Sequence, residues 1–330
     1  MRWTPALLLL LGLALALGHG GDSGPGLASE PQDVEASAAP PPEPPPPEAP
    51  PEPPPPEPAP AEPPSEPPPA DAPLPEPIPV RPMSWQAAGA FVWHETDVDP
   101  EALGEELRRN GFGWVAVFLH DGLVEDALVV DWVARFQRSS GLPVGGWGVL
   151  RTAPEEEAAL AHTLVERHGL AFYVANAEAE YGYTGPEGPD AERFERSRRF
   201  VDAFRARLPG LPSGLSTYCR ADRHDLDWAS WNRAGFVLLP QAYANDFGPE
   251  ATPAECVRGA TGFFARERVH PTVGMHPGAR RPLGAWRYAR LLEEAGTVGF
   301  SVYLAETRMT LAAWGAFGVA IARLGIARTP

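Results

Sequence analysis

Eight short apolar runs recur through the C-terminal three quarters of the chain, and a stretch with helical features follows each one. The runs are 89–93, 114–119, 144–150, 171–178, 214–218, 236–243, 269–275 and 300–304. Apolar runs of this length are typical of strands that are buried on both faces. Strands that alternate with helices predict a parallel sheet, and eight such units predict that the sheet closes. We therefore expect an α/β fold, a (β/α)8 TIM barrel.

The helical stretches carry recognisable ends. Asp99-Pro100 has the pattern of an N-cap and first helical residue, and Gly111 follows as a stop. Thr152-x-x-Glu155 and Thr252-Pro-Ala-Glu255 resemble capping boxes. The eight expected helices cover 99–111, 124–138, 152–169, 191–208, 228–233, 252–267, 283–295 and 311–324.

The predicted barrel domain covers residues 83–330, which is the usual size for this architecture. An open, doubly wound sheet is the alternative arrangement of the same elements. No glycine-rich dinucleotide fingerprint follows the first expected strand, so a Rossmann fold is disfavoured.

Residues 1–18 have the pattern of a secretory signal peptide. Arg2 gives the positive start, residues 6–17 are apolar apart from Gly12, and small residues precede His19. The run is short for a transmembrane helix, although an uncleaved membrane anchor is an alternative. No cysteine follows it, so we do not expect a lipoprotein. We expect a secreted or cell-envelope protein.

Residues 19–82 form a segment rich in proline and glutamate. The part from Pro40 to Pro82 holds 25 of the 42 prolines. Such a segment cannot bury enough apolar surface to fold, so we expect a disordered and extended spacer. It also carries much of the formal charge of −16. The barrel region has no basic stripe, which excludes nucleic acid as an expected partner.

The chain has two cysteines, Cys219 and Cys256. An exported protein can keep them as a disulfide. The sequence does not bring them together in space, so a disulfide and two buried free thiols both stay open.

Acidic residues follow the fourth expected strand. Side chains alternate along a strand, so Phe172, Val174, Asn176, Glu178 and Glu180 are predicted to share one face. Two neighbouring carboxylates are costly to bury without a partner, which points to ion pairs, metal binding or acid/base chemistry.

Most of the other expected strands also end in polar or aromatic side chains, and this end of a TIM barrel carries the active site. These residues include Trp93, His94, His120, Asp121, Trp147, Tyr218, Gln241, Tyr243, His276, Tyr303 and Glu306. Carboxylates, amides and aromatic rings together suit a sugar, because rings cover its apolar face and polar groups bind its hydroxyls. Paired carboxylates can also cleave a glycosidic bond.

The motif Asn176-x-Glu178-x-Glu180 resembles the Asp-x-Asp-x-Glu motif of family 18 glycoside hydrolases, the chitinase-like barrels. Pro240-Gln-Ala-Tyr243 is similar to their Met-x-Tyr, and the acidic strand 4 also resembles family 25 barrels. More broadly, residues 83–330 resemble the glycoside-hydrolase-like barrels of exported bacterial and phage proteins.

This resemblance implies a role for each matching residue. It gives Glu180 the part of the general acid, Glu178 that of the residue orienting an acetamido group, and Tyr243 that of the tyrosine holding this group. The chain departs from the pattern in three places. Asn176 and Glu178 replace aspartates, and Tyr303 and Glu306 lie where the family has a tryptophan.

The leading hypothesis is a secreted glycoside hydrolase that acts on a β-linked, N-acetylated glycan such as peptidoglycan or chitin. Glu180 donates the proton, and Glu178 or Glu306 stabilises or attacks the reacting carbon. The residues expected to bind the sugar are Asn176, Gln241, Tyr243, Trp93, Trp147 and Tyr303. We expect a monomer that needs no cofactor and touches no membrane beyond a signal anchor.

Two alternatives belong to other classes. One is a non-catalytic glycan-binding barrel that the spacer displays at the cell envelope or on a virion. The other is a metal-dependent hydrolase whose ligands come from His94, His120, Asp121 and His276. No His-x-His or His-Glu-x-x-His motif supports the metal, so our prediction assigns no metal site.

Overall fold

The computed structural model describes residues 79–93, 98–126, 131–182, 190–221, 224–275, 283–305, 309 and 311–326. The predicted signal peptide, most of the predicted spacer, and the candidates His94, His276 and Glu306 lie outside these residues, so statements about them stay predictions. No helix in the described part is long and apolar enough to cross a membrane.

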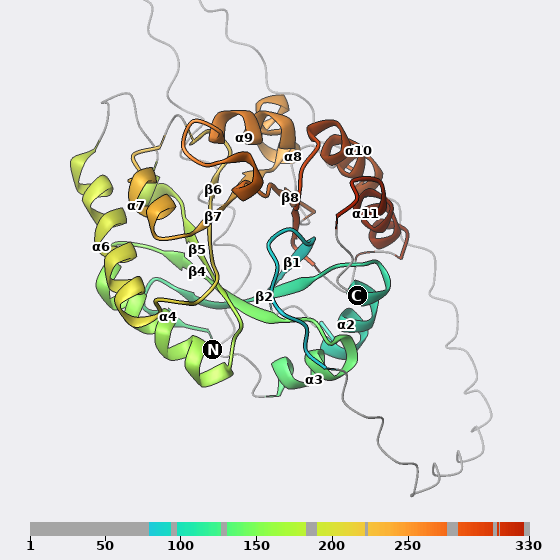
Figure 1. The fold of residues 1–330 in the computed structure, drawn as a ribbon, viewed down its shortest axis with the longest axis horizontal. Helices are drawn as coiled ribbons and strands as arrows, with labels where there is room; N and C mark the ends of the chain where they lie inside the picture. Colours follow the sequence, from blue (N-terminus) through green and yellow to red (C-terminus); the bar gives the residue numbers. More distant parts are fainter. Residues whose placement is uncertain are drawn as a thin grey trace, which may run out of the picture. The chain divides into compact units, whose positions relative to one another are not determined.

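Eight parallel strands close into a barrel, because β1 pairs with both β2 and β9 (Figure 1). The strands are β1 Gly89–Val92, β2 Trp114–Asp121, β4 Val144–Leu150, β5 Tyr173–Ala177, β6 Ser213–Tyr218, β7 Val237–Ala242, β8 Thr272–Gly274 and β9 Ser301–Tyr303. Each strand begins and ends within three residues of the apolar run that predicted it. The predicted TIM barrel is therefore confirmed.

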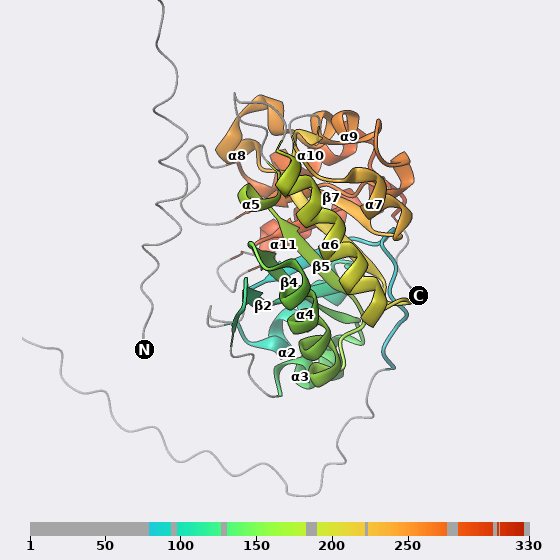
Figure 2. The same ribbon diagram turned by 90° about the vertical axis from the view of Figure 1, so that its left-hand side faces the viewer.

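Helices surround the sheet, and Figure 2 shows α4 and α6 side by side over β4 and β5. The longer helices are α2 Pro100–Arg109, α3 Trp132–Ser140, α4 Pro154–His168, α6 Ala191–Arg207, α9 Pro253–Ala260, α10 Ala285–Ala295 and α11 Leu311–Arg323. Short helices follow three strands: α5 Ala179–Gly182 after β5, α7 Trp228–Arg233 after β6 and α8 Ala244–Phe247 after β7. Two short 3-10 helices, Pro249–Ala251 and Arg266–Arg268, flank α9.

The predicted helix over 124–138 is wrong at its start. Val124–Glu125 forms β3, which folds back antiparallel on the end of β2. Gly122 makes the turn with a φ of +56°, a left-handed conformation that glycine adopts without strain. The helix itself begins at Trp132.

The helix-cap predictions had mixed outcomes. Asp99 caps α2 as predicted, because its side chain accepts a hydrogen bond from the backbone N–H of Glu101 at 3.0 Å. The capping box at Thr152 is wrong, since Pro154 begins α4 and Ala153 occupies the N-cap position. At α9, Thr252 is the N-cap residue but its side chain makes no capping hydrogen bond.

Aromatic side chains fill the barrel interior in two levels. At the N-terminal ends of the strands, Trp114 packs edge to face on Trp85 and Phe172, with ring centroids 5.5 and 5.3 Å apart. Gly89 leaves room for this indole, because a side chain there would overlap it. Phe91 connects this level to Trp147 above it, 6.1 Å away. The barrel is thus a packed core beneath its mouth.

The two cysteines form a disulfide, which decides between the two states left open by the sequence. Cys219 directly follows β6, and Cys256 lies in α9. Their α-carbons lie 4.7 Å apart although 37 residues separate them in the chain. The bond ties the end of β6 to the helix layer.

Candidate functional site

The acidic stretch after β5 departs from the predicted ladder. The strand ends at Ala177, and α5 begins at Ala179. Phe172 and Val174 therefore face the barrel interior as predicted, followed by Asn176 at the mouth. Glu178 lies in the connection, and the helical turn directs Glu180 to a different set of partners. The two carboxylates are neighbours in sequence but have separate surroundings.

Two amides hold Glu178. Its Oε1 accepts hydrogen bonds from Asn176 Nδ2 at 3.0 Å and from Gln241 Nε2 at 2.7 Å. Gln241 also lies 3.0 Å from Asn176 Oδ1 and 3.4 Å from the hydroxyl of Ser216. Asn176, Ser216 and Gln241 are buried, whereas Glu178 is half-buried. This arrangement fixes the orientation of one carboxylate at the mouth of the barrel.

An arginine holds Glu180. Arg151 follows β4, and its Nη1 donates to Glu180 Oε1 at 2.7 Å. Its Nε and Nη2 bind the two oxygens of Asp121 at 2.5 and 2.9 Å. The hydrogen bond to Asp121, and then that to Glu180, raises the pKa of Arg151 above its usual range, although burial opposes the rise. The guanidinium therefore stays charged between the two carboxylates.

An aromatic cluster lies next to these groups. Trp93 packs on Phe118 with centroids 4.6 Å apart and meets Trp147 edge to face at 6.1 Å. Trp147 is only 4% exposed, and its indole nitrogen donates to the carbonyl of Val92 at 3.2 Å. The half-buried Trp93 is thus the more accessible of the two tryptophans, and Trp147 supports it from below.

A row of rings extends from the mouth to the rim. Tyr243 stacks on Tyr303 with centroids 5.8 Å apart, and its ring is nearly parallel to that of Phe247 at 6.4 Å. Phe247 is 47% exposed and also meets Tyr218 edge to face at 6.3 Å. The row offers apolar faces from the interior to the surface.

The hydroxyls of Tyr243 and Tyr218 in this row are neutral. Burial raises the pKa of Tyr243 well above its usual value, and the neighbouring Tyr303 and Glu178 add to the rise. Burial, followed by the charges of Glu178 and Glu180, also raises the pKa of Tyr218. Both hydroxyls can therefore donate hydrogen bonds at any physiological pH.

The structure brings most of the predicted site residues to one end of the barrel. These are Trp93, Trp147, Asn176, Glu178, Glu180, Gln241, Tyr243 and Tyr303. Their roles stay predictions, as does the role of Glu306, which lies outside the described residues. Sequence reasoning missed Arg151, Ser216 and Phe247 as members of the site, and it identified Tyr218 only as a residue at a strand end. Arg151 directly follows a strand, so the rule that found the other strand ends could have found it.

His120 does not face the mouth. β2 has an irregularity after Phe118, so that His120 lies opposite Gly148 and points toward the helices. Its ring nitrogens bond the carbonyl of Gly122 at 2.9 Å and the hydroxyl of Tyr173 at 2.8 Å. Burial lowers the pKa of His120 to about 4. Within the described ranges, no group of three or more His, Cys, Asp or Glu could hold a metal ion.

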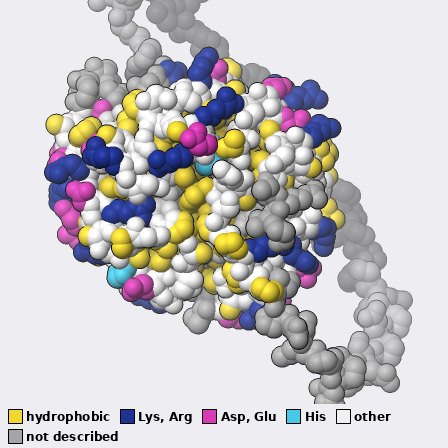
Figure 3. All heavy atoms as spheres, in the orientation of Figure 1, with side chains coloured by type: hydrophobic (Ala, Val, Ile, Leu, Met, Phe, Trp, Pro, Cys, Tyr) yellow, Lys and Arg dark blue, Asp and Glu magenta, His cyan; other side chains and the backbone are white. Residues whose placement is uncertain are grey.

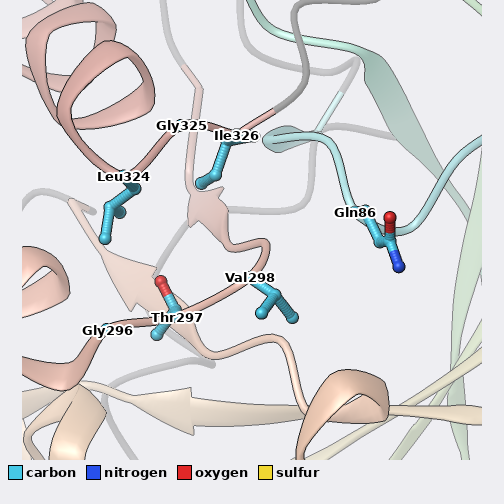
Figure 4. Close-up of a pocket in the computed structure, with 7 residues that line it drawn as sticks. All are labelled: Gln86, Gly296, Thr297, Val298, Leu324, Gly325 and Ile326. Atoms are coloured by element: carbon cyan, nitrogen blue, oxygen red, sulfur yellow. The ribbon is translucent and has the colours of Figure 1, made fainter.

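A pocket of 380 Å³ lies away from these residues, near the N-terminal ends of the strands (Figure 4). Its lining comes from the segments before β1, before β9 and after α11: Gln86, Gly296, Thr297, Val298, Leu324, Gly325 and Ile326. It contains no acidic or basic side chain. It therefore has none of the acid/base groups found at the mouth.

The visible surface shows no single-sign patch. On the face drawn in Figure 3, arginine and acidic side chains intermingle toward the edges, and hydrophobic side chains gather nearer the middle. Many of the arginines pair with acids, as Arg199 does with Glu155 at 2.6 and 2.7 Å. Such pairs balance the surface charge of the helix layer.

Comparisons with known proteins give the same architecture. No family model and no curated protein matches the chain. Among solved structures, a class V chitinase from Nicotiana tobaccum aligns with a TM-score of 0.53 at 7% identity, over 71% of this chain and 98% of the chitinase. The PgaB glycoside hydrolase domain from Bordetella bronchiseptica gives 0.51 at 10% identity, over 71% and 97%.

A chitinase-like agglutinin from Robinia pseudoacacia aligns with a TM-score of 0.50 at 8% identity, over 70% of this chain and 98% of the agglutinin. At such low identities the likeness shows the fold alone. The resemblance to glycoside-hydrolase-like TIM barrels is thereby confirmed for the architecture.

Proposed function

We propose that the protein is a glycoside hydrolase that acts on a β-linked, N-acetylated glycan such as peptidoglycan or a chitin-like polymer. The main support for this proposal is that two carboxylates, Glu178 and Glu180, lie at the mouth of the barrel and are bound by different side chains. Neighbouring structures support the substrate class. One of them is a family 18 chitinase variant from Cycas revoluta in complex with (GlcNAc)4, which aligns with a TM-score of 0.52.

The two carboxylates suit different roles. In the proposed reaction, Glu180 gives its proton to the glycosidic oxygen as the bond to the sugar carbon breaks. The oxygen of a water molecule then bonds to that carbon, and a proton of this water returns to Glu180. Glu178 is oriented by two amides, so it can hold the acetamido group or stabilise positive charge on the sugar ring. Glu306 remains the proposed alternative partner of Glu180.

The surroundings suit a sugar ring. Half-buried Trp93 and Tyr303 present aromatic faces, and the hydroxyl of Tyr243 donates hydrogen bonds. Gln241 and Asn176 are already committed to Glu178, so their proposed contribution is to position that carboxylate. Phe247 extends the apolar surface to the rim, where a further sugar unit of a polymer could stack.

The second candidate is a non-catalytic glycan-binding barrel. The ion pair between Arg151 and Glu180 favours it, because it engages the carboxylate that would have to act as the acid. One of the similar structures is named a chitinase-like agglutinin, so a barrel of this kind does not always carry the name of an enzyme. Under this proposal the same aromatic row binds the glycan and no bond is cleaved.

We further propose that the protein works outside the cytoplasm, as a monomer. The disulfide between Cys219 and Cys256 supports export, because structural disulfides persist in oxidising compartments. Cell fractionation would test the location, and light scattering of the purified chain would test the oligomeric state.

The deciding experiment incubates the full chain with peptidoglycan and with chitin oligosaccharides, and detects new reducing ends by mass spectrometry. Glu180→Gln is run beside the wild type. Glu155→Gln, which breaks a surface ion pair on α4, is the matched control. Products from the wild type and the control but not from Glu180→Gln would support the hydrolase. Glycan retained on a pull-down without products from any variant would favour the binding barrel.

A further inference from the structure

Arg151 makes three side-chain hydrogen bonds to carboxylates at the mouth, and the proposed reaction gives it no role. We propose that Arg151 is a positioning residue that sets where the Glu180 carboxylate lies and supplies the positive charge in contact with it. The inference rests on the proposed function for its catalytic consequence. Its physical basis is a set of contacts around the two residues.

Asp121 anchors the arginine. The two oxygens of Asp121 bind Nε and Nη2 of Arg151, which is the paired geometry that the planar guanidinium favours. The irregularity in β2 after Phe118 shifts the register so that Asp121 lies opposite Val149, two residues before Arg151. Because Asp121 fixes the guanidinium, Nη1 is held in one place and Glu180 must come to it.

A buried carboxylate on α4 fixes the backbone beneath both residues. Glu157 is fully buried, and its Oε1 accepts the backbone N–H of Arg151 at 2.8 Å and that of Ala153 at 3.2 Å. Its Oε2 accepts the hydroxyl of Tyr181 at 3.2 Å. Tyr181 is the residue after Glu180. The Glu157 side chain therefore holds the chain both at Arg151 and next to Glu180, the two partners of the ion pair.

The carbonyl of Glu180 is held as well. Arg196 on α6 donates a hydrogen bond to it, and its guanidinium lies 5.8 Å from the ring centre of Tyr181. The backbone of Glu180 is therefore held beside Arg151. Only the second oxygen of its side chain, Oε2, is buried with no hydrogen-bond partner among the residues described, and this oxygen is available to carry a proton.

The charged and titratable groups around Glu180 come from five other elements or their ends. They are Asp121 from β2, Arg151 from β4, Glu178 after β5, Tyr218 from β6 and Arg196 from α6. Arg151 is the cation in direct contact with its carboxylate. Removing a cation at that distance favours the protonated acid, typically by one or more pH units.

The kinetic test uses Arg151→Gln in the full chain. The alkaline limb of the profile of kcat/KM against pH should move to higher pH by about one unit or more, because Glu180 then keeps its proton longer. Arg151→Lys should restore part of the difference. Arg199→Gln removes a fork-like pair with Glu155 on the surface and should leave the limb where it is. Coinciding limbs for wild type and Arg151→Gln would overturn the inference.

A second readout does not need turnover. Protein labelled with ¹³C at the glutamate carboxyl carbons is titrated by NMR, and the Glu180 signal is identified by its absence in Glu180→Gln. The titration midpoint of this signal should rise in Arg151→Gln. A rise without glycan cleavage by any variant would refute the proposed function and keep the inference. Glycan cleavage without a rise in the titration midpoint would refute the inference and support the proposed function. If Arg151→Gln fails to fold by circular dichroism, Arg151→Lys replaces it, with a smaller rise expected.

Discussion

At the C-terminal ends of the strands, hydrogen bonds and ion pairs join side chains beside the rings of the mouth, whereas at the N-terminal ends aromatic packing dominates. Arg151 with its two carboxylates represents the first arrangement. Trp114 with Trp85 and Phe172 represents the second. The pocket near the N-terminal end adds apolar and neutral polar walls but no charge.

The difference separates two tasks of the barrel. Removing polar groups from water costs free energy, so such groups are expected where contacts with a ligand offset that cost. Buried aromatic area stabilises the fold wherever it lies, and the fully buried rings of Trp114 and Phe172 lie below the mouth. We therefore expect substitutions at the N-terminal end to change stability and substitutions at the mouth to change activity or glycan binding.

The largest expected effect is on the N-terminal side. Trp114→Ala removes a fully buried indole and should lower the free energy of unfolding by about 3–5 kcal/mol. The melting temperature should fall by about 10 °C, measured by circular dichroism. Glycan affinity of the folded fraction should stay unchanged. A large loss of glycan affinity at a temperature where the variant is folded would contradict the expectation that the N-terminal ends determine stability and the mouth determines binding.

The next largest effect is expected from acid. We expect low pH to lower the stability of the whole barrel, without a difference between the two ends of the strands. Burial lowers the pKa of His270, before β8, to about 4, as it does for His120. An unfolded histidine takes up its proton near pH 6.5, so protons favour the unfolded chain. Stability should be full above about pH 6.5 and should fall toward pH 4, by roughly 3 kcal/mol per histidine.

Urea unfolding between pH 7 and pH 4 measures this slope. His270→Gln should flatten it. His162→Gln is the control, because that side chain is only half-buried and lies beside Glu166. An identical slope in wild type and His270→Gln would show that the buried ring is not the source of the acid sensitivity.

A smaller effect is expected at the rim. Phe247→Ala should weaken binding of long chitin oligosaccharides about fivefold, since an exposed stacking ring contributes about 1 kcal/mol. Short oligosaccharides that do not reach the rim should bind as before. Phe194→Ala on α6 removes a ring of equal exposure, 48% against 47%, and should change neither. Equal losses for both variants in titration calorimetry would argue against a role of the rim.

The smallest effect is expected in the pocket near the N-terminal end. The hydroxyl of Thr297 is buried there and has no hydrogen-bond partner within the described part of the chain (Figure 4). Thr297→Val removes this polar group at constant shape, so stability should stay equal or rise by up to about 1 kcal/mol. Glycan binding should not change. A marked loss of stability in a denaturant titration would reveal a partner for the hydroxyl.

Much of the fold could be predicted because repeating patterns determine it. The eight apolar runs mark the eight strands, since each parallel strand is buried on both faces. The errors lie where one residue changes a local geometry. Gly122 turned an expected helix start into the hairpin of β3, and Pro154 moved the start of α4 away from its predicted cap.

The candidate site was predictable only in part for the same reason. Strand alternation placed Asn176 correctly, but β5 ends one residue later, and a helical turn carries Glu180 to Arg151. The irregularity in β2 exchanged the faces of His120 and Asp121, which period-two reasoning cannot foresee. The pairing of Cys219 with Cys256 likewise depends on the closed barrel and not on local sequence.

That disulfide has a practical consequence for anyone who prepares the protein. It closes a loop of 37 residues that contains β7, Gln241, Tyr243 and Phe247. Cross-linking a loop of this length stabilises a fold by about 4 kcal/mol in the chain-entropy account. Protein made in a reducing cytoplasm, or stored with a reductant, would lose this support on the side of the barrel that carries the aromatic row. An inactive preparation should therefore be re-examined after oxidation before its inactivity is ascribed to the sequence.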